Sequence, residues 1–164
     1  MLLVVVLLGL FIIGAMGFVV VPRVGFWLAG AETPRVARVL PWLSAGLFSL
    51  AWVLPNPTFE HTSTFTQHAV GGGAACALAG LFVALNLGLR SSILRVAFAY
   101  AVAASLGVTV ELLELAYDQM QGTQLAADSA WDLLANSTGA VLVAVLLECG
   151  VAMSRRANIA PLPS

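Results

Sequence analysis

The chain has 164 residues, of which 60% are hydrophobic and only 9% are charged. Soluble domains average about 25% charged residues, so the composition excludes an ordinary soluble globular domain. Its net charge is −1, lysine is missing, and no basic cluster points to a nucleic-acid partner. The sequence therefore predicts an all-α, multi-pass protein of a cell membrane, surrounded by membrane lipids.

Apolar runs of membrane-spanning length recur along the chain, and no polar stretch is long enough to form a second domain. We predict one transmembrane domain over residues 1–153, followed by a short cytoplasmic tail over residues 154–164. The predicted domain is a bundle of five transmembrane helices, over residues 2–21, 34–54, 67–89, 93–117 and 128–153.

The first two spans are separated by a short connection. Residues 2–21 lack a positive segment in front of the apolar run, which favours a retained helix over the alternative, a cleaved signal peptide. Thr33 and Pro34 suit the cap and first position of the second helix. Pro41 is expected to bend that helix, and the prolines from Pro55 onward to end it.

Small residues recur at helical spacing in the last three spans. In the third span they are four residues apart and follow His68 along one helix face. Small side chains let another helix backbone approach closely in a membrane. We therefore expect helix packing through Gly72, Cys76, Gly80, Gly107 and Gly139.

Polar residues cluster where the fourth span ends and the fifth begins. Glu111 and Glu114 lie late in the fourth span. In the fifth, Asp128, Asp132 and Asn136 are four residues apart and share one helix face. Ionised side chains inside a membrane are costly, so these residues should face a partner or a wet cavity. For Asp128 the alternative is an N-cap of the fifth helix.

Arginine placement predicts the topology. With five spans, all the positively charged residues fall on one side of the membrane, and the positive-inside rule makes that side cytoplasmic. The N-terminus is then outside and the C-terminus inside. The residues concerned are Arg23, Arg35, Arg38, Arg90, Arg95, Arg155 and Arg156.

The same topology brings polar residues of three spans to one depth near the outer face. No arginine is predicted there to neutralise the acids, so they need a cation, protonation or hydrogen bonds. We predict an outward-facing ligand pocket formed by His68, Glu111, Glu114, Asp128, Asp132 and Asn136. Alternatives are an interfacial histidine bonded to a carboxylate, and hydrogen bonds between helices. Glu148, at the opposite end, is expected to pair with an arginine.

No metal or cofactor is predicted, because the chain lacks a specific ligand spacing such as His-Glu-x-x-His. Metal binding by the histidine and the acids remains an alternative.

The segment from Glu111 to Tyr117 is followed by a short loop and then by Asp128-x-x-x-Asp132-Leu-Leu-Ala-Asn136-x-x-Gly139. This pattern resembles the C-terminal half of VanZ-like membrane proteins. His68 matches a histidine near the start of the preceding span, and the likeness covers about residues 67–147. The loop differs by lacking the arginine that is common in the family, and the doubled glutamate suggests a separate branch. The resemblance implies, at most, a part in glycopeptide-antibiotic resistance.

We therefore expect a cell-envelope membrane protein, not an enzyme, that binds a lipid-linked envelope precursor or a cation. Two other functions stay open: a membrane enzyme that uses the histidine and carboxylates in acid–base or metal chemistry, and a scaffold subunit of a membrane complex. Self-association of the bundle is also open.

Overall fold

A computed structural model describes residues 35–56, 64–121 and 126–157, together with positions 20, 23, 24 and 27. In this described part the regular elements are all helices, as predicted. They are η1 (Arg35–Val39), α2 (Leu40–Ala51), η2 (Gln67–Ala75), α3 (Cys76–Asn86), α4 (Ser92–Gln121) and α5 (Ala126–Ala157). The predicted first span, residues 2–21, lies outside the described residues except for position 20.

Three of the described helices are long and apolar enough to cross a membrane: Gln67–Asn86, Ser92–Met120 and Ser129–Met153. The predicted second span is shorter than expected, since its apolar helix covers only Ala37–Ala51. Crossing the hydrocarbon core takes about 20 residues at 1.5 Å each, so the described part contains three helices of spanning length.

Pro41 occupies the first turn of α2 instead of bending a longer helix. A proline at this position loses no helical hydrogen bond, because the first N–H groups of a helix have no partner within it. The preceding turn, η1, is a tighter 3₁₀ helix. The expected bend is therefore a change of helix type at the start of α2.

The predicted third span is also divided. Its first part, η2, is a π-helix that contains the run Gly71–Gly73, and its second part, α3, is an α-helix. It ends at Asn86, earlier than the predicted residue 89, because Gly88 adopts a positive φ of 72°. The N–H of Gly88 bonds Leu85 O and that of Leu89 bonds Ala84 O, which is the Schellman pattern of helix ends.

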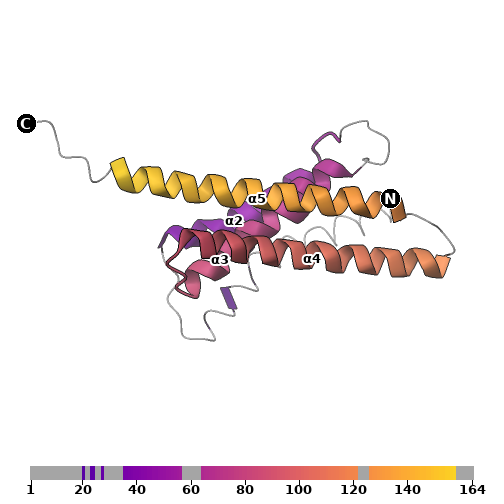
Figure 1. The fold of residues 1–164 in the computed structure, drawn as a ribbon, viewed down its shortest axis with the longest axis horizontal. Coiled ribbons are helices and arrows are strands. Elements are labelled where there is room, and N and C mark those ends of the chain that lie inside the picture. The colour runs from indigo at the N-terminus through magenta and orange to yellow at the C-terminus, as the bar shows by residue number, and fades with distance from the viewer. Residues whose placement is uncertain are drawn as a thin grey trace, which may run out of the picture.

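The η2–α3 segment lies at the centre of the bundle and contacts α2, α4 and α5 (Figure 1). Its contact surfaces are built mostly from small residues, which allow the helix backbones to approach closely. The fully buried alanines are Ala37, Ala75, Ala77, Ala84, Ala99, Ala103, Ala135, Ala140 and Ala144.

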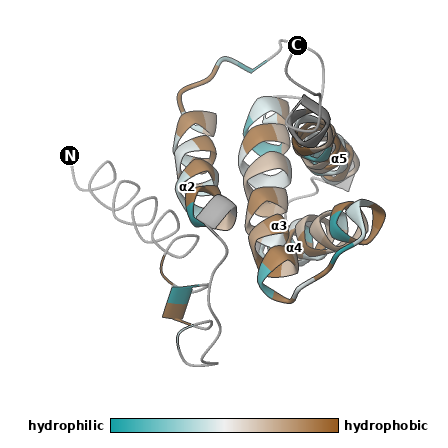
Figure 2. Cartoon of the chain, turned by 90° about the vertical axis from the view of Figure 1, so that its left-hand side faces the viewer, coloured by the Kyte–Doolittle hydropathy of each residue, from teal (hydrophilic) through white to brown (hydrophobic). Residues whose placement is uncertain are grey.

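Helices α4 and α5 lie side by side along the long axis and run in opposite directions (Figure 1). Both expose large apolar side chains, such as Leu113 and Leu146, as expected of surfaces that face lipid. In Figure 2 hydrophobic residues recur along α2, α3, α4 and α5.

Both helices are longer than predicted. Helix α4 continues to Gln121, and α5 runs from Ala126 to Ala157, so the first residues of the predicted tail are helical. Asp128 lies within the first turn of α5, not before it, and the predicted N-cap position is therefore wrong. The side chain of Asp128 is outside what the structure describes.

Candidate functional site

His68 lies in the first turn of the π-helix η2 and points toward α4 and α5. Its Nδ1 is 3.7 Å from Glu111 Oε1 of α4, and its Nε2 is 3.5 Å from Asp132 Oδ2 of α5. Both distances exceed the 2.7–3.2 Å of a direct N–H···O hydrogen bond. The imidazole therefore sits between two carboxylates from different helices, close enough for strong electrostatic interaction. We call His68, Glu111 and Asp132 the histidine–carboxylate cluster.

The two carboxylates of this cluster are almost fully buried, with 5% of Glu111 and 4% of Asp132 exposed. Asp132 accepts a hydrogen bond from Thr64, whose Oγ1 is 2.8 Å from Asp132 Oδ1. A hydroxyl that donates to a carboxylate stabilises its ionised form and fixes its orientation. Thr64 was not identified from the sequence, because no local pattern connects it with Asp132.

Asn136 adds a buried amide beside the cluster. Only 3% of this residue is exposed, and its Nδ2 is 3.5 Å from His68 Nδ1. Its Oδ1 has no hydrogen-bond partner among the residues that the structure describes. An amide oxygen buried without a donor is costly, which makes it a candidate contact for a ligand.

Two glycines make room for this amide. A Cβ added at Gly72 would lie 1.9 Å from Asn136 Oδ1, and one added at Gly107 would lie 2.8 Å from Asn136 Nδ2. The amide thus occupies space between η2 and α4 that side chains would otherwise fill.

Other glycines bring the helix backbones themselves together. A Cβ at Gly139 would lie 1.8 Å from Ala69 O, and one at Gly80 would lie 2.8 Å from Ala99 Cα. These backbones cannot move aside as a flexible side chain could. The residues predicted for packing thus lie at close helix approaches, and Cys76 is buried beside them.

A cavity of about 380 Å³ adjoins the cluster. Its walls come from the end of α2, from η2 and from α4, and Asn136 of α5 reaches into it. The polar groups include His68 and Glu114, while Phe48, Trp52, Leu106 and Val110 provide apolar walls. Asp132 does not line the cavity but lies behind His68, which it contacts. His68 therefore links a buried carboxylate to an accessible space.

Four of the six predicted pocket residues come together, since His68 lies next to Glu111, Asp132 and Asn136. Glu114 is exposed and borders the cavity on the same side as His68. The side chain of Asp128 cannot be placed, as noted above.

The three charged members of the cluster also satisfy the geometry of a metal site. One ligand atom from each of His68, Glu111 and Asp132 can be chosen so that all three lie within 4.8 Å of one another. Atoms this close can share a point about 3 Å or less from each of them. No sequence motif could show this, because each residue comes from a different helix.

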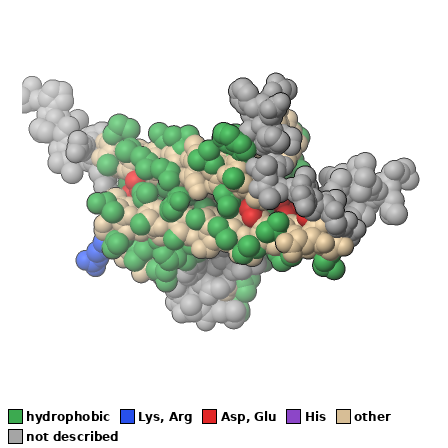
Figure 3. All heavy atoms as spheres, turned by 45° about the vertical axis from the view of Figure 1, so that its right-hand side comes forward, with side chains coloured by type: hydrophobic (Ala, Val, Ile, Leu, Met, Phe, Trp, Pro, Cys, Tyr) green, Lys and Arg blue, Asp and Glu red, His purple; other side chains and the backbone are tan. Residues whose placement is uncertain are grey.

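Charge is distributed unevenly along the bundle. Figure 3 shows a face on which the larger group of acidic side chains lies toward one end, while the basic side chains in view lie at the other. Arg95 of α4 lies at the basic end and is buried, with 4% of the residue exposed. Its guanidinium bonds both oxygens of Glu148 of α5, at 2.5 Å each. The predicted pairing of Glu148 with an arginine is confirmed.

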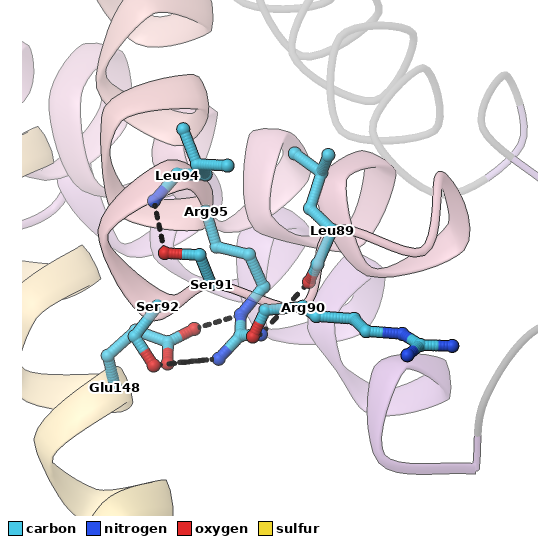
Figure 4. A network of polar contacts seen from close by, with 7 residues as sticks. All are labelled: Leu89, Arg90, Ser91, Ser92, Leu94, Arg95 and Glu148. Carbon is cyan, nitrogen blue, oxygen red and sulfur yellow. Dashed lines mark hydrogen bonds and ion pairs between the residues drawn. The ribbon is translucent and has the colours of Figure 1, made fainter.

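The remaining donors of Arg95 are used within the α3–α4 turn (Figure 4). Nη1 bonds the carbonyl oxygens of Leu89 and Arg90, and Nη2 bonds Ser92 Oγ. This network ties the turn to α5, and so sets how α4 and α5 are aligned at the far end of the molecule from His68.

A scan against protein-family models finds no matching family, and searches of curated proteins and of solved structures find no match.

Proposed function

We propose that this chain is a VanZ-like protein of the cell membrane that binds an amphiphilic ligand, lipid-linked or cationic. The head of the ligand would lie at His68 and Glu114, which border the cavity, and its apolar part along the cavity. The observation that carries the proposal is the cavity itself, in which His68 and Glu114 adjoin the apolar walls of Trp52 and Leu106. Ligand sites commonly combine apolar walls with a few convergent polar groups.

The charge of the site favours a cationic head. Glu111 and Asp132 lie beside His68, and Glu114 interacts electrostatically with all three. Even a protonated histidine would leave an excess of acidic groups. Among the side chains that the structure describes in α4 and α5, the one arginine is Arg95, which lies at the opposite end and pairs with Glu148. A positive head would therefore gain electrostatic attraction that an anionic one would not.

We further propose the five-span topology, with the N-terminus outside and the pocket opening outward. The segregation of arginines in the sequence supports it. Reporter fusions test it: a fusion within residues 58–63 should report an external location, and one after residue 157 a cytoplasmic location. A cytoplasmic signal from the first fusion would overturn the topology.

Binding can be tested with defined amphiphiles in lipid nanodiscs. The probes are a fluorescent long-chain alkylammonium and the matching alkyl phosphate, with energy transfer from Trp52 as the readout and Trp52→Phe as its control. We expect saturable binding of the ammonium probe, and about a 10-fold weaker affinity in Glu114→Gln, the size of one lost charged contact.

Asp118→Asn is the matched control, because Asp118 is an acid of the same helix that does not line this cavity. It should bind the probe as the unaltered protein does. The proposal fails if neither probe binds saturably or if Glu114→Gln has no effect. Stronger binding of the phosphate would show that the head is anionic.

The VanZ resemblance adds a cellular test. Expression in a glycopeptide-sensitive bacterium should raise tolerance to teicoplanin, and Glu114→Gln should abolish the gain while reaching the membrane in equal amount. If both forms have no effect on tolerance, the part in resistance is rejected.

A membrane enzyme is the second candidate. It is favoured by the convergence of His68, Glu111 and Asp132 on one point, as acid–base or metal-assisted chemistry requires. A scaffold role has less support, because Cys76 and Gly80 are buried against neighbouring helices and do not form an open docking stripe.

A further inference from the structure

We propose that the histidine–carboxylate cluster binds one divalent transition-metal ion, with the Asn136 amide oxygen as a fourth ligand. The ligands would be one imidazole nitrogen of His68 and one oxygen each of Glu111 and Asp132. The inference concerns the cluster alone and does not depend on what the cavity binds.

The distances within the cluster are too long for direct hydrogen bonds and leave room for an ion beside the imidazole. His68 Nδ1 lies 3.7 Å from Glu111 Oε1, and Nε2, on the other side of the ring, lies 3.5 Å from Asp132 Oδ2. An ion would use one of these two nitrogens, and one ligand atom from each of the three residues can be chosen so that all lie within 4.8 Å of one another. Ligand atoms of a tetrahedral Zn²⁺ are separated by about 3.4 Å, so the side chains would close in on the ion by small rotations.

Asn136 is an independent indication of a ligand. Only 3% of this residue is exposed, it lines the same cavity as His68, and its Oδ1 has no donor among the described residues. Its Nδ2 lies 3.5 Å from His68 Nδ1, so a half-turn of the amide would place the oxygen beside the imidazole. Glycines at positions 72 and 107 leave space for this amide next to the imidazole. A carboxamide oxygen is an established ligand of hard and intermediate cations.

The chemistry of the ligand set selects the class of ion. Two buried carboxylates that lie beside one imidazole favour a divalent cation, whose charge would balance theirs. An imidazole nitrogen favours Zn²⁺, Mn²⁺ or Fe²⁺ over Mg²⁺ and Ca²⁺, which prefer oxygen ligands only. Thr64 donates to Asp132 Oδ1 and so orients the carboxylate, whose Oδ2 is the atom nearer to His68.

The test uses the full chain in detergent, stripped with a chelator and titrated with Zn²⁺ alone by calorimetry. Co²⁺ serves as a spectroscopic probe through its visible d–d bands. We expect one equivalent of each ion to bind, and His68→Ala and Asp132→Asn each to weaken Zn²⁺ affinity at least about 10-fold, as even outer-shell changes do. Asp118→Asn should bind normally.

Two further measurements guard against variants that fold poorly. Zn²⁺ should raise the melting temperature of the unaltered protein and of Asp118→Asn but not of Asp132→Asn, because only a folded site gains stability from its ion. Asn136→Asp, which exchanges the amide for a carboxylate, should bind Zn²⁺ at least as tightly as the unaltered protein.

Absence of stoichiometric binding by the unaltered protein would overturn the proposal, as would equal affinities in His68→Ala and Asp132→Asn. Since no amphiphile is present, these outcomes leave the ligand proposed for the cavity to be judged by its own experiment.

Discussion

The two ends of the α4–α5 pair hold buried acidic side chains in opposite ways. At one end Glu148 of α5 meets Arg95 of α4, and five hydrogen bonds use every N–H donor of that guanidinium. At the other end Asp132 of α5 and Glu111 of α4 both lie beside His68, and Asp132 accepts a hydrogen bond from Thr64.

We interpret the first arrangement as structural and the second as suited to binding a ligand. The Arg95–Glu148 pair is balanced within the protein, so it stabilises the alignment of two helices and leaves nothing for a ligand to satisfy. The histidine–carboxylate cluster instead sets two acids beside one imidazole, and the cation proposed above would balance them. The predictions below test this contrast, from the largest expected effect on stability to the smallest.

Removing the counter-charge of Arg95 should have the largest effect on the free energy of unfolding. Glu148→Gln leaves Arg95, only 4% exposed, without its counter-charge, and should reduce the free energy of unfolding by about 3–5 kcal/mol. The measurement is denaturant or thermal unfolding in mixed micelles. An unchanged stability would show that the ion pair does not hold this end.

A change that separates the helices near the cluster should come next. Gly139→Ala places a methyl group 1.8 Å from the backbone oxygen of Ala69, and should cost about 3 kcal/mol because the neighbouring backbone must shift. Gly150→Ala in the same helix is the control, since nothing lies within 4 Å of its added Cβ. It should be neutral or slightly stabilising, as alanine favours helices. Equal effects would contradict the close approach of η2 and α5.

Thr64→Val should have a smaller effect that is concentrated in the cluster. It removes one hydrogen bond to Asp132 and should cost about 1 kcal/mol of unfolding free energy. If the cluster binds a metal, affinity should also fall about 10-fold, because Thr64 orients a ligand. Thr138→Val is the control, since that hydroxyl bonds only the Leu134 carbonyl of its own helix. Zn²⁺ titration of both variants gives the comparison.

Asp132→Asn should change the stability of the metal-free protein least, by about 1 kcal/mol or less. It removes one of several like charges, which offsets the loss of its attraction to His68. Unfolding should therefore be far less affected than in Glu148→Gln. A comparable loss in the two variants would show that the cluster is as much a structural ion pair as the other end.

Several parts of this arrangement could be predicted from local patterns. Asp132 and Asn136 are one helical turn apart, so their common face followed from spacing once α5 was recognised as a helix. The pairing of Glu148 with an arginine followed from the cost of an isolated charge in an apolar helix. The residues at which helices end were harder to predict from the sequence. The positive φ of Gly88 and the extension of α4 to Gln121 depend on turn geometry.

Other parts had no local signal. The π-helical form of η2 was not foreseen, although its three consecutive glycines weaken the preference for an α-helix. The hydrogen bond between Thr64 and Asp132 joins residues 68 positions apart, and the metal-like geometry joins three helices. Such contacts depend on helix rotation and depth, which hydropathy does not specify.

The sequence by itself determined that the chain forms apolar helices suited to a membrane, and that most of their charged residues lie near the helix ends. Both follow from short, contiguous stretches, on which helix formation and burial in lipid depend. Only the tertiary structure decided that His68, Glu111 and Asp132 meet beside Asn136. Glycines at positions 72, 73, 107 and 139 let the backbones of η2, α4 and α5 approach until side chains from separate helices share one small volume.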